Sequence, residues 1–572
     1  GVHVQDARAL RHELERRGWV DWIVPGAPGL EPRRLCFVRE EAAEALAERI
    51  GTEEEGVRDL SFRTRDVLDR VVRVEITAGV NRFFADLASS LQGTGLDLVD
   101  ARSLPTRTRG SAPWELPAVE GYGCLRSGDR WAPFFVAWDR AGAPDAHRRA
   151  RVAAWTRAAD VAERAVGKRI APILVVGAGQ RELSQWECSL RRRVEPDRSL
   201  HALLAGAGDV LRLGPMAPVW LCAGSSDHAG LLELLAWGEE PAVRPVRLAG
   251  EAEPPRIDRS RQPLREWAPR AATGQVHASA RERVAAVALA TDAEEKRLLE
   301  WIARHPLLAG EELSELLEVP GEAIERRLDW LTRCGAVLAS DCSPIGPTAG
   351  KPRRYVLTDL GLRLLAARDR VPPARYVRSA GLTVVESGTE AKVQCRVLRH
   401  PAHAIGVNRT VARLASNARA AGWRLTQWRN EAESARHFRV RDRTRWIRPD
   451  ASGVLRCATG SRAFLLEYDR GTLDGGDYRA KLAGYDAYFA SSTWEEDFET
   501  QPALLFVCTD DRAERRVARA ISVHAPALPL LLTTEWRFER VGGESMGLLR
   551  AIWARPGDRE RRIEPFLTEA GR

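Results

Sequence analysis

The sequence lacks the features that mark several common classes of protein. Its 9 cysteines, from Cys36 to Cys508, include no CxxC pair and no Cys/His cluster at metal-ligand spacing, which excludes a zinc ribbon and a disulfide framework. No apolar run reaches the roughly 18 residues of a membrane span, and the first residues form no signal-peptide pattern. We therefore expect a cytoplasmic protein without a membrane partner.

Neither sign of charge dominates the chain. Its 87 Lys and Arg residues stand against 79 Asp and Glu, which gives a net charge of +8 and a pI near 9.2. This mild excess is compatible with a polyanionic partner and equally with solvated basic surfaces. At 572 residues the chain should form several domains, each with its own core. Because it opens with Gly1 rather than Met, the sequence leaves open whether its natural start lies upstream.

A phosphate-binding loop is missing as well. The stretch VVGAGQREL from Val175 is rich in glycine, but it lacks the GK[ST] ending of such a loop. This absence disfavours a nucleotide-driven motor, and we interpret the stretch as a turn from a strand to a helix.

What the chain does contain is an internal repeat. Residues 118–155 align without a gap with residues 448–485 at a constant offset of 330, which pairs Gly123 with Gly453. Weaker matches precede them: residues 78–98 answer residues 405–425 at an offset of 327, and residues 9–50 resemble residues 323–371. The sequence therefore predicts two copies of one unit, the first of which enters partway through.

The region before the second copy of the repeat reads as three helices followed by a hairpin and a closing helix, over residues 293–372. Leu298, Leu299 and Ile302 lie at helical spacing, and Pro320 suits the first turn of the third helix. This order resembles a winged-helix DNA-binding domain, in which the third helix enters a major groove and the hairpin touches backbone phosphates. The resemblance implies DNA contacts from Arg326, Arg327 and Arg333 on the third helix and from Lys351, Arg353 and Arg354 on the hairpin.

A protein-docking role for this region stays open. The third helix also carries Glu322, Glu325 and Asp329, which would repel phosphate, and winged helices serve as docking modules too. If DNA is bound, the basic residues of the hairpin would position it in a salt-dependent way rather than read its bases.

Acidic residues on two predicted strands form the candidate site. If strands 447–457 and 461–469 pair through the turn at ATGS, Glu467 lies opposite Asp450 or one diagonal step away, on the same face of the sheet. Asp469 shares that face because strand side chains alternate. Three ionised carboxylates would repel one another unless a hard divalent cation neutralised them.

A lysine follows these acids. Lys481 lies early on a predicted helix over residues 478–492, after Asp477 as its N-cap, and Tyr485 lies one turn further on the same face. An ammonium group there can orient an attacking water or stabilise charge that develops on a phosphate. Arg470 could do the same from the strand end. The whole series is a helix at 408–421, strands at 423–429, 446–457 and 461–470, the helix at 478–492 and a strand at 502–510.

Pro449-Asp450 and Glu467 in this α-β-β-β-α-β order resemble the PD-(D/E)xK nuclease superfamily. Together with the winged helix, EYDRG and the downstream K…Y, the chain resembles the replication-relaxation family of bacterial plasmids and other mobile elements, well over about 290–555 and in degraded form over 1–245. The resemblance implies a DNA-binding protein of plasmid or mobile-element replication and maintenance, with replication or mobilisation proteins as further partners. It also implies an endonuclease site with Asp450, Glu467 and Lys481 as catalytic residues, Asp469, Arg470 and Tyr485 as supporting residues, and Mg²⁺ or Mn²⁺ held by Asp450, Glu467 and Asp469.

Two details bear on this assignment. The lysine expected two residues after the second acid is replaced by Asp469, so Lys481 would have to act from the helix. His403 fits the opening H…N pattern of the family, and we interpret it as a helix-start or core histidine.

The first copy keeps the apolar framework but not the acids. Glu467 is answered there by Ala137, Asp450 by Glu120, Asp469 by Asp139, Arg470 by Arg140, Lys481 by Arg151 and Tyr485 by Trp155. Losing the second acid leaves too few ligands for a catalytic metal. We expect a kept fold and a lost site, in a lobe that could still bind DNA or pair with the second copy.

The predicted fold class is an α/β multidomain chain of two tandem units, each a winged helix plus a PD-(D/E)xK-like domain. The expected segments are a partial winged helix at 1–56, a degenerate nuclease-like domain at 57–245, a linker at 246–290, a winged helix at 291–375 and a nuclease-like domain with the acidic motif at 376–572. A noncatalytic DNA-binding or assembly scaffold stays open, because fold alone does not separate it from a nuclease. Binding of a divalent ion by the acids would discriminate between them.

Overall fold

Helices and strands alternate along the computed structural model. It describes residues 4–24, 35–38, 42, 64–104, 119–140, 142–143, 145–166, 170–191, 200–222, 225, 227–239, 264–340, 352–380, 384–385, 401–440, 443–524, 528–541, 547–555 and 563–566. The contacts divide the chain into two compact units, Gly1–Arg297 with Arg363–Ser379 and Leu298–Leu362 with Ala380–Arg572. Among the described residues, no helix is long and apolar enough to cross a membrane.

The first unit contains a seven-stranded mixed sheet in the order β3-β4-β5-β6-β7-β8-β9. β5, β6 and β7 run parallel, and the other neighbouring pairs run antiparallel. We call this sheet and its helices the first lobe. Its strands are β3 (Asp97–Ser103), β4 (Gly121–Ser127), β5 (Arg130–Trp138), β6 (Ile173–Gly177), β7 (Ala202–Gly206), β8 (Trp220–Cys222) and β9 (His228–Ala229), and its helices are α5 (Val74–Ser90), α6 (Asp145–Val166), α7 (Gln180–Arg191), α8 (Ala207–Leu213) and α9 (Leu231–Leu234).

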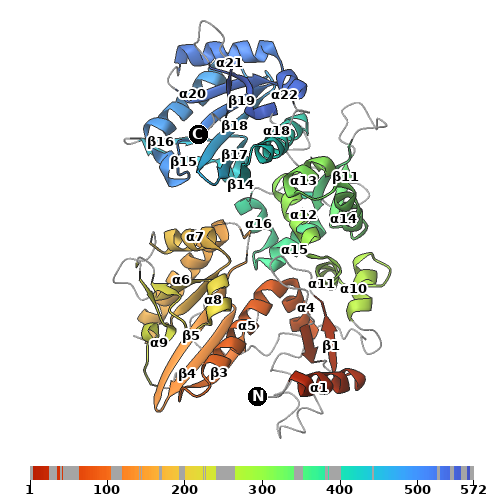
Figure 1. Ribbon diagram of the computed structural model, residues 1–572, viewed down its shortest axis with the longest axis vertical. Helices are drawn as coiled ribbons and strands as arrows, with labels where there is room; N and C mark the ends of the chain where they lie inside the picture. Colours follow the sequence, from red (N-terminus) through yellow and green to blue (C-terminus); the bar gives the residue numbers. More distant parts are fainter. Residues whose placement is uncertain are drawn as a thin grey trace. The chain divides into compact units, whose positions relative to one another are not determined.

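Helices cover both faces of this sheet (Figure 1). On one face, Phe83 of α5 packs with Phe134 of β5 in one apolar cluster. On the other, Trp155 of α6 and Trp186 of α7 stack with ring centroids 5.2 Å apart and join a second cluster. Alternation along β5 therefore assigns its side chains to two separate cores.

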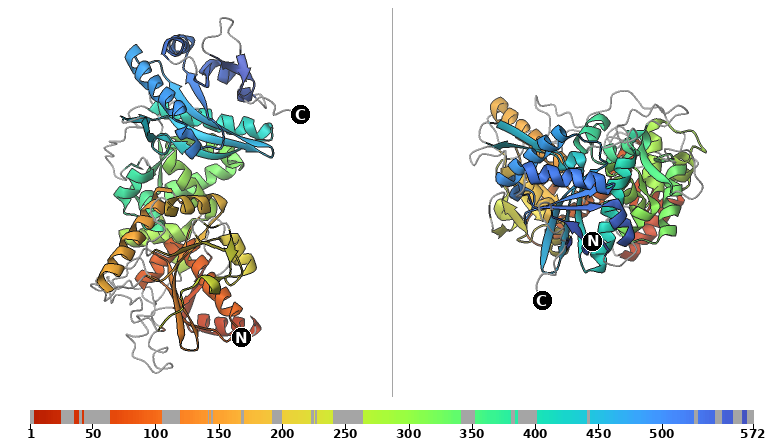
Figure 2. Two further views of the ribbon diagram at one scale, coloured as in Figure 1. Left: turned by 90° about the vertical axis from the view of Figure 1, so that its left-hand side faces the viewer. Right: turned by 90° about the horizontal axis from the view of Figure 1, so that it is seen from above.

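The second unit contains a sheet with the same order and the same strand directions, β14-β17-β18-β19-β20-β21-β22. We call this sheet and its helices the second lobe (Figure 2). Its strands are β14 (Arg424–Asn430), β17 (Ala451–Cys457), β18 (Gly460–Asp469), β19 (Ala503–Cys508), β20 (Leu530–Thr534), β21 (Ala551–Ala554) and β22 (Ile563–Pro565), and its helices are α18 (Pro401–Ala420), α19 (Glu431–Ser434), α20 (Gly475–Ala490), α21 (Asp511–His524) and α22 (Glu535–Val541), with 3-10 turns η2 (Thr493–Glu496) and η3 (Gly547–Leu549).

Residues at the repeat offsets hold the same positions in the two lobes. The register of β3 on β4 shifts between Leu98 and Asp100, and that of β14 on β17 shifts between Leu425 and Gln427. A Cβ at Gly79 of α5 would lie 2.1 Å from the ring of Trp138, and a Cβ at Gly406 of α18 would lie 2.1 Å from the ring of Tyr468. In both lobes glycine is therefore required where this helix crosses the third strand of the sheet, which is β5 in the first lobe and β18 in the second.

The predicted three helices and hairpin before the second lobe are present. They are α12 (Ala293–Arg304), α13 (Gly310–Leu317), α14 (Gly321–Arg333), β11 (Val337–Ser340) and β12 (Arg354–Thr358), with β10 (Leu308–Ala309) completing the sheet order β10-β12-β11 and β13 (Val384–Val385) pairing with β12. α15 (Asp359–Arg368) and α16 (Pro373–Ala380) follow. We call residues 293–358 the helix–hairpin module.

This module packs on the second lobe through specific contacts. The Asn408 amide donates to the carbonyl of Pro306 at 2.8 Å, and Arg304 pairs with Glu433 at 2.8 Å. The ring of buried His305 stacks on Trp428 of β14 with centroids 3.4 Å apart. Residues 298–358 of the module and the second lobe accordingly belong to one compact unit.

Three expectations are wrong in detail. The predicted strand 446–457 is two strands, because β16 (Arg443–Ile447) pairs with β15 (Arg436–Val440) in a hairpin of its own and β17 starts only at Ala451. The predicted linker 246–290 holds two helices, α10 (Leu264–Ala272) and α11 (Ala280–Ala290). The N-cap of α20 is Asp474 rather than Asp477, which closes the capping box from the third helical position.

The two helices within the expected linker pack on the start of the chain. α10 lies against β1 (Val20–Ile23), where the Leu264 amide donates to the Asp21 carboxylate at 3.0 Å, and α11 packs on α4 (Thr64–Val72). α1 (Val4–Arg16) precedes β1, which pairs with β2 (Leu35–Val38). Helices from residues 264–290 thus pack on β1 and α4, near the start of the chain.

Candidate functional site

The candidate site lies where β17 begins, beside β18, in the second lobe. Asp450 comes directly before β17, and its amide donates to the carbonyl of Leu466 at 3.0 Å. This contact departs by one residue from the β17–β18 register, in which Ala451 faces Leu466, so Asp450 and Ala451 both lie beside Leu466 and Asp450 is next to Glu467 of β18. The hairpin has the register expected from the sequence, and the two acids are neighbours across it.

Glu467 is held by two side chains of α20. The Lys481 ammonium donates to one carboxylate oxygen and the Tyr485 hydroxyl donates to the other. Glu467 is 1% exposed, whereas the Lys481 side chain is 30% exposed. The lysine therefore joins a buried carboxylate to the surface of the lobe, one helical turn before Tyr485.

Asp450 has a different pair of partners. One of its oxygens lies 3.1 Å from Nε2 of His403, in the first turn of α18, and the other accepts from the amide of Tyr468 at 2.8 Å. From the sequence we expect His403 to be a helix-start or core histidine, because nothing in its neighbourhood marks a partner 47 positions later. The structure brings it into the site, where the H…N family pattern is the only sequence signal that could have singled it out.

Asp469 does not join the other two acids. One of its oxygens accepts from the Tyr478 hydroxyl and the other from the amide of Gly471 at 2.9 Å. Arg470 follows it as an exposed residue at the strand end. Within the parts of the chain that the structure describes, no group of three or more His, Cys, Asp or Glu side chains is placed to hold a metal ion. The expected convergence of three carboxylates is therefore reduced to two.

Burial and mutual charge set the protonation of these groups. Burial raises the pKa of Glu467 to about 8, and the charge of Lys481 offsets this only in part. Burial alone would lower the pKa of Lys481, but the charges of Glu467 and Asp450 outweigh it and raise that pKa. Likewise the hydrogen bond and charge shared by His403 and Asp450 outweigh burial, so the pKa of the imidazole is raised and that of the carboxyl is lowered. Each acid therefore has a basic side chain of this chain as its partner, Lys481 for Glu467 and His403 for Asp450.

The basic residues of α14 and of the hairpin that follows it differ in their exposure to solvent. Arg326 and Arg333 are exposed on α14, with Arg333 lying 5.1 Å from the ring of Trp330, and Arg327 is half-buried. Exposed Arg353 lies 3.6 Å from Asp329. Arg354, expected as a DNA contact, is instead buried and paired with Glu312 at 3.0 Å, so its guanidinium holds α13 to β12. Lys351 lies outside the described residues.

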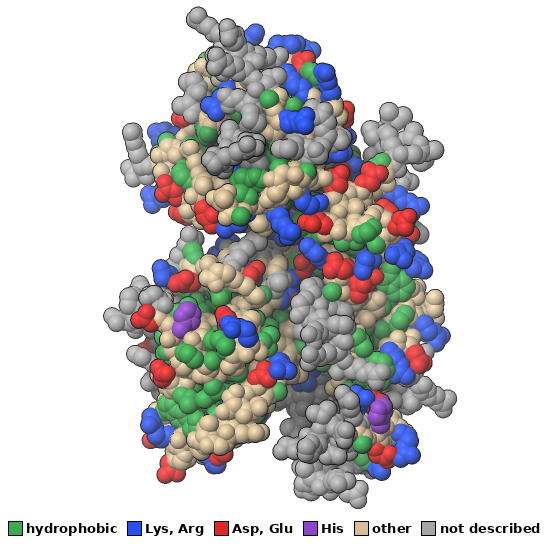
Figure 3. Space-filling model, viewed as in Figure 1, with side chains coloured by type: hydrophobic (Ala, Val, Ile, Leu, Met, Phe, Trp, Pro, Cys, Tyr) green, Lys and Arg blue, Asp and Glu red, His purple; other side chains and the backbone are tan. Residues whose placement is uncertain are grey.

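The β15–β16 hairpin adds a surface that the sequence did not reveal. Its register places His437 opposite Trp446 and Arg439 opposite Thr444, so these four exposed side chains share one face. Trp446 is 61% exposed and directly precedes the approach to Asp450. On the face of the molecule drawn in Figure 3, Lys and Arg side chains are interspersed with Asp and Glu.

Comparison with known proteins places a family on this part of the chain. Residues 299–504 match the replication-relaxation family. The matched segment is less than half of the chain, and it supports the family for the helix–hairpin module and the core of the second lobe, from α12 to the start of β19. No curated protein and no solved structure matches the chain. All five residues of the site, His403, Asp450, Glu467, Lys481 and Tyr485, lie inside the replication-relaxation segment.

Outside the replication-relaxation segment, the first lobe keeps the backbone contact of the site with other side chains. Glu120 accepts from the amide of Trp138 at 3.1 Å, as Asp450 accepts from that of Tyr468. Arg151 pairs with Glu120 at 2.7 Å, and its guanidinium lies 5.4 Å from the ring of Trp155. Ala137 replaces Glu467 in the first lobe. Arg151 therefore has one acid as its partner, whereas Lys481 of the second lobe lies near two, Glu467 and Asp450.

Proposed function

We propose that this chain is a DNA-binding protein of plasmid or mobile-element replication whose second lobe hydrolyses DNA phosphodiester bonds. The observation that carries the proposal is the convergence of Asp450, Glu467 and Lys481 from a strand start, a strand and a helix, inside the segment that matches the replication-relaxation family. Two carboxylates beside one ammonium group, with the ammonium reaching the surface, are the groups that metal-assisted phosphoryl chemistry uses.

Asp450 and Glu467 are the residues that would hold Mg²⁺ or Mn²⁺. Their carboxylate oxygens are hard donors, and the two acids are neighbours across the hairpin, whereas Asp469 accepts from Tyr478 and from the amide of Gly471 apart from them. A bound ion would supply Lewis-acid polarisation of the scissile phosphate. Lys481, once it exchanges Glu467 for a phosphate oxygen, stabilises the charge that develops there, and His403 keeps Asp450 oriented.

DNA would be held by the helix–hairpin module and by the β15–β16 hairpin. Arg326, Arg333 and Arg353 supply exposed guanidinium groups on the module, and Arg439 and Trp446 supply a cation and a stacking surface beside the site. Because the module and the second lobe form one compact unit, DNA bound by the module would reach the site in a fixed geometry. Replication or mobilisation proteins would be further partners in this proposal.

The test is cleavage of supercoiled, linear and single-stranded DNA with Mg²⁺ or Mn²⁺ by the parent protein, Glu467→Ala and Lys481→Ala, with DNA binding measured in parallel. We expect both variants to bind DNA as the parent does and to lose cleavage. Arg456→Ala is the matched control, because Arg456 forms a surface ion pair with Glu499 at 2.7 Å in the same lobe and should leave cleavage unchanged. Equal behaviour of all four proteins would refute the hydrolytic role.

A second candidate is a noncatalytic DNA-binding or assembly scaffold. It is favoured by the pairing of Glu467 with Lys481 and Tyr485 and of Asp450 with His403, which leaves both acids satisfied without a cation. In that case the parent protein binds DNA, cuts none with either metal, and shows no change in thermal stability when Mg²⁺ is added.

We also propose that the two lobes descend from one duplicated unit. The proposal is supported by the identical strand order and directions, by the register shift at equivalent places in β3 and β14, and by the matching contacts of Gly79 and Gly406. A shared fold alone could arise twice, but the same irregularity at the same repeat offset is a stronger sign of common descent.

A further inference from the structure

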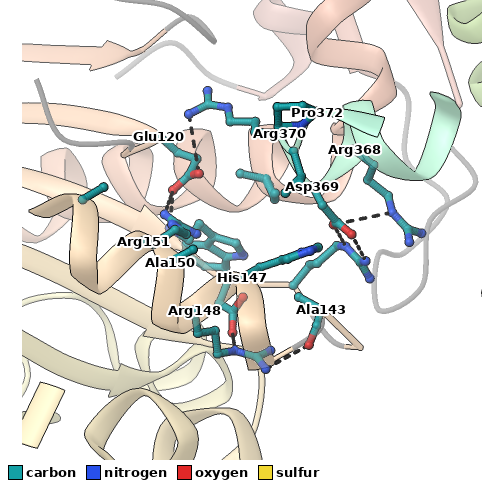
Figure 4. A pocket seen from close by; sticks show the side chains of 16 residues that line it. Glu120, Ala143, His147, Arg148, Ala150, Arg151, Arg368, Asp369, Arg370 and Pro372 are labelled. Atoms are coloured by element: carbon teal, nitrogen blue, oxygen red, sulfur yellow. Dashed lines mark hydrogen bonds and ion pairs between the residues drawn. The ribbon is translucent and has the colours of Figure 1, made fainter. Parts of the chain in front are cut away.

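The first lobe holds a cavity at the place that corresponds to the site of the second lobe (Figure 4). Its volume is about 160 Å³, and it is lined by residues of β5, α6 and the segment after α15. Figure 4 shows Glu120 with Arg151 and Arg370 on one side, Asp369 with Arg368 on another, and Arg148 beside Ala143 on a third. All of these residues belong to the first compact unit.

The charges that line this cavity do not balance. Its arginines are Arg140, Arg148, Arg151, Arg368 and Arg370, whereas its acids are Glu120, Asp139 and Asp369. Each acid is closest to a different arginine: Arg140 pairs with Asp369 at 2.5 Å, Arg148 with Asp139 at 2.7 Å and Arg151 with Glu120 at 2.7 Å. The lining thus carries two more guanidinium than carboxylate charges, and His147 adds a further titratable group.

Most of these charges are out of contact with water. The side chains of Arg140, Arg148 and Asp369 are 2 to 4% exposed. The buried Nη2 of Arg148 and the buried Nε of Arg370 have no hydrogen-bond partner. Burying an excess of positive charge and leaving charged N–H donors unsatisfied are both costly, and a bound anion removes both costs.

We propose that this cavity binds the phosphate of a phosphate monoester. Guanidinium groups match phosphate oxygens in geometry, and a monoester phosphate carries roughly 1.5 to 2 negative charges at neutral pH, which offsets the excess of two. The cavity has room for such a group, and the rim residues Arg151 and Arg370, 21% and 12% exposed, leave it a way in. A diester or a carboxylate would offset only one charge.

The same position in the two lobes thus takes opposite partners. Where the second lobe places Glu467, Lys481 and Tyr485, the first lobe places Ala137, Arg151 and Trp155. Where Tyr478 donates to Asp469, Arg148 donates to Asp139. The exchange of Glu467 for Ala137 removes an acid, that of Tyr478 for Arg148 adds a guanidinium, and those of Lys481 for Arg151 and Tyr485 for Trp155 leave the charge unchanged, so the first lobe favours an anion where the second has two acids. The terminal phosphate of a DNA strand and that of a free nucleotide share this chemistry.

The test is isothermal titration of the full chain with inorganic phosphate, thymidine 5′-monophosphate, and one oligonucleotide with either a 5′-phosphate or a 5′-hydroxyl group. We expect the phosphorylated oligonucleotide to bind more tightly than its 5′-hydroxyl form if DNA ends are the source, and the mononucleotide to bind as well as either if free nucleotides are. Arg148→Gln should weaken phosphate binding by at least about tenfold, since it removes a charged hydrogen-bond donor.

Glu120→Gln guards against a simple loss of folding. It removes one carboxylate from the lining, so it should tighten phosphate binding, an effect that a damaged fold would not produce. Arg126→Gln is the control, because Arg126 forms an exposed ion pair with Asp97 at 2.8 Å in the same lobe and should change nothing. The proposal is overturned if no probe binds at millimolar concentration, if Arg148→Gln and Glu120→Gln bind as the parent does, or if the 5′-hydroxyl oligonucleotide binds as tightly as the phosphorylated one with equal sensitivity to Arg148→Gln.

Discussion

Two tyrosines of α20 differ in one hydrogen bond and offer a matched measurement of it. The hydroxyl of Tyr485 donates to Glu467. The buried hydroxyl of Tyr488, which lies about one helical turn after Tyr485, has no hydrogen-bond partner. Tyr485→Phe should lower the free energy of unfolding by about 1 to 3 kcal/mol, because an oxygen of buried Glu467 loses its donor. Tyr488→Phe should be neutral or slightly stabilising, because it removes an unsatisfied hydroxyl.

Thermal unfolding of the two variants beside the parent protein checks this. Both substitutions delete one oxygen atom from a tyrosine that is at most 1% exposed, so differences in packing cancel in the comparison. A Tyr488→Phe protein as unstable as Tyr485→Phe would show that Glu467 does not depend on the Tyr485 hydroxyl.

At the residue scale, the sequence predicts pairs that are close along a hairpin and misses those that the fold brings together. Asp450 and Glu467 could be paired because the ATGS turn limits the register to a few values. Asp469 was expected beside them because alternation fixes the face of a side chain, but alternation does not say which donor it meets, and Tyr478 takes it. The contact of His403 with Asp450 was missed for the same reason, because the two residues come from different elements of the fold.

At the scale of elements, the contact between the helix–hairpin module and β14 should depend on pH through His305. Burial lowers the pKa of this imidazole well below its usual value, with the charge of Arg304 adding to the effect. The unfolded chain therefore takes up a proton below about pH 6.5 while the folded chain does not, and stability falls by up to roughly 1.4 kcal/mol per pH unit as the pH drops. Above that pH this group has no effect on stability.

His305→Phe should keep the stacking on Trp428 and remove the titration. Melting temperatures at pH 7.5 and pH 5 are compared for this variant, for the parent and for His524→Phe, which changes an exposed histidine at the end of α21. We expect a smaller loss on acidification in His305→Phe than in the other two proteins. An equal loss in all three would place the pH dependence elsewhere.

The β15–β16 hairpin should contribute to DNA affinity. Trp446→Ala should weaken binding of single-stranded DNA by about 1 to 3 kcal/mol through a lost stacking surface. Arg439→Gln should lower the slope of log affinity against log salt by roughly 0.7 through a lost phosphate contact. Fluorescence anisotropy over a range of salt concentrations measures both, with Trp536→Ala as the control because Trp536 is a 45% exposed tryptophan on α22.

This hairpin was missed because its sequence hides the alternation that marks a strand. Most of its residues are charged or polar on both faces, and only Phe438 and Ile447 are buried. The prediction of a linker was wrong over 264–290 for the opposite reason. α11 is apolar on nearly every side, so its sequence shows no helical period. The capping box at Ser279 is the one local signal that marks where this helix starts. The elements around the acids were found because their apolar positions repeat in two parts of the chain.

At the scale of the whole molecule, an asymmetry between two similar lobes decides what products to expect. The first lobe has Ala137 where the second has Glu467, and its cavity is lined by arginines, so each chain carries one Asp–Glu pair at this position of the sheet. One such site can cut only one strand of a duplex in a single encounter. If the proposed hydrolysis holds, supercoiled plasmid should therefore first become an open circle, and linear DNA should form later and in proportion to a second, independent cut.

Gel analysis of plasmid products over time, at several protein concentrations, checks this order. Glu120→Gln should leave the course of the reaction unchanged, because Glu120 belongs to the arginine-lined cavity rather than to the acidic pair. Linear DNA formed from the outset, at a rate that rises with the square of protein concentration, would instead mean that two chains act together on one duplex. In that case the second lobes of two chains would each cut one strand of the duplex, and the first lobe would contribute to the assembly of the two chains.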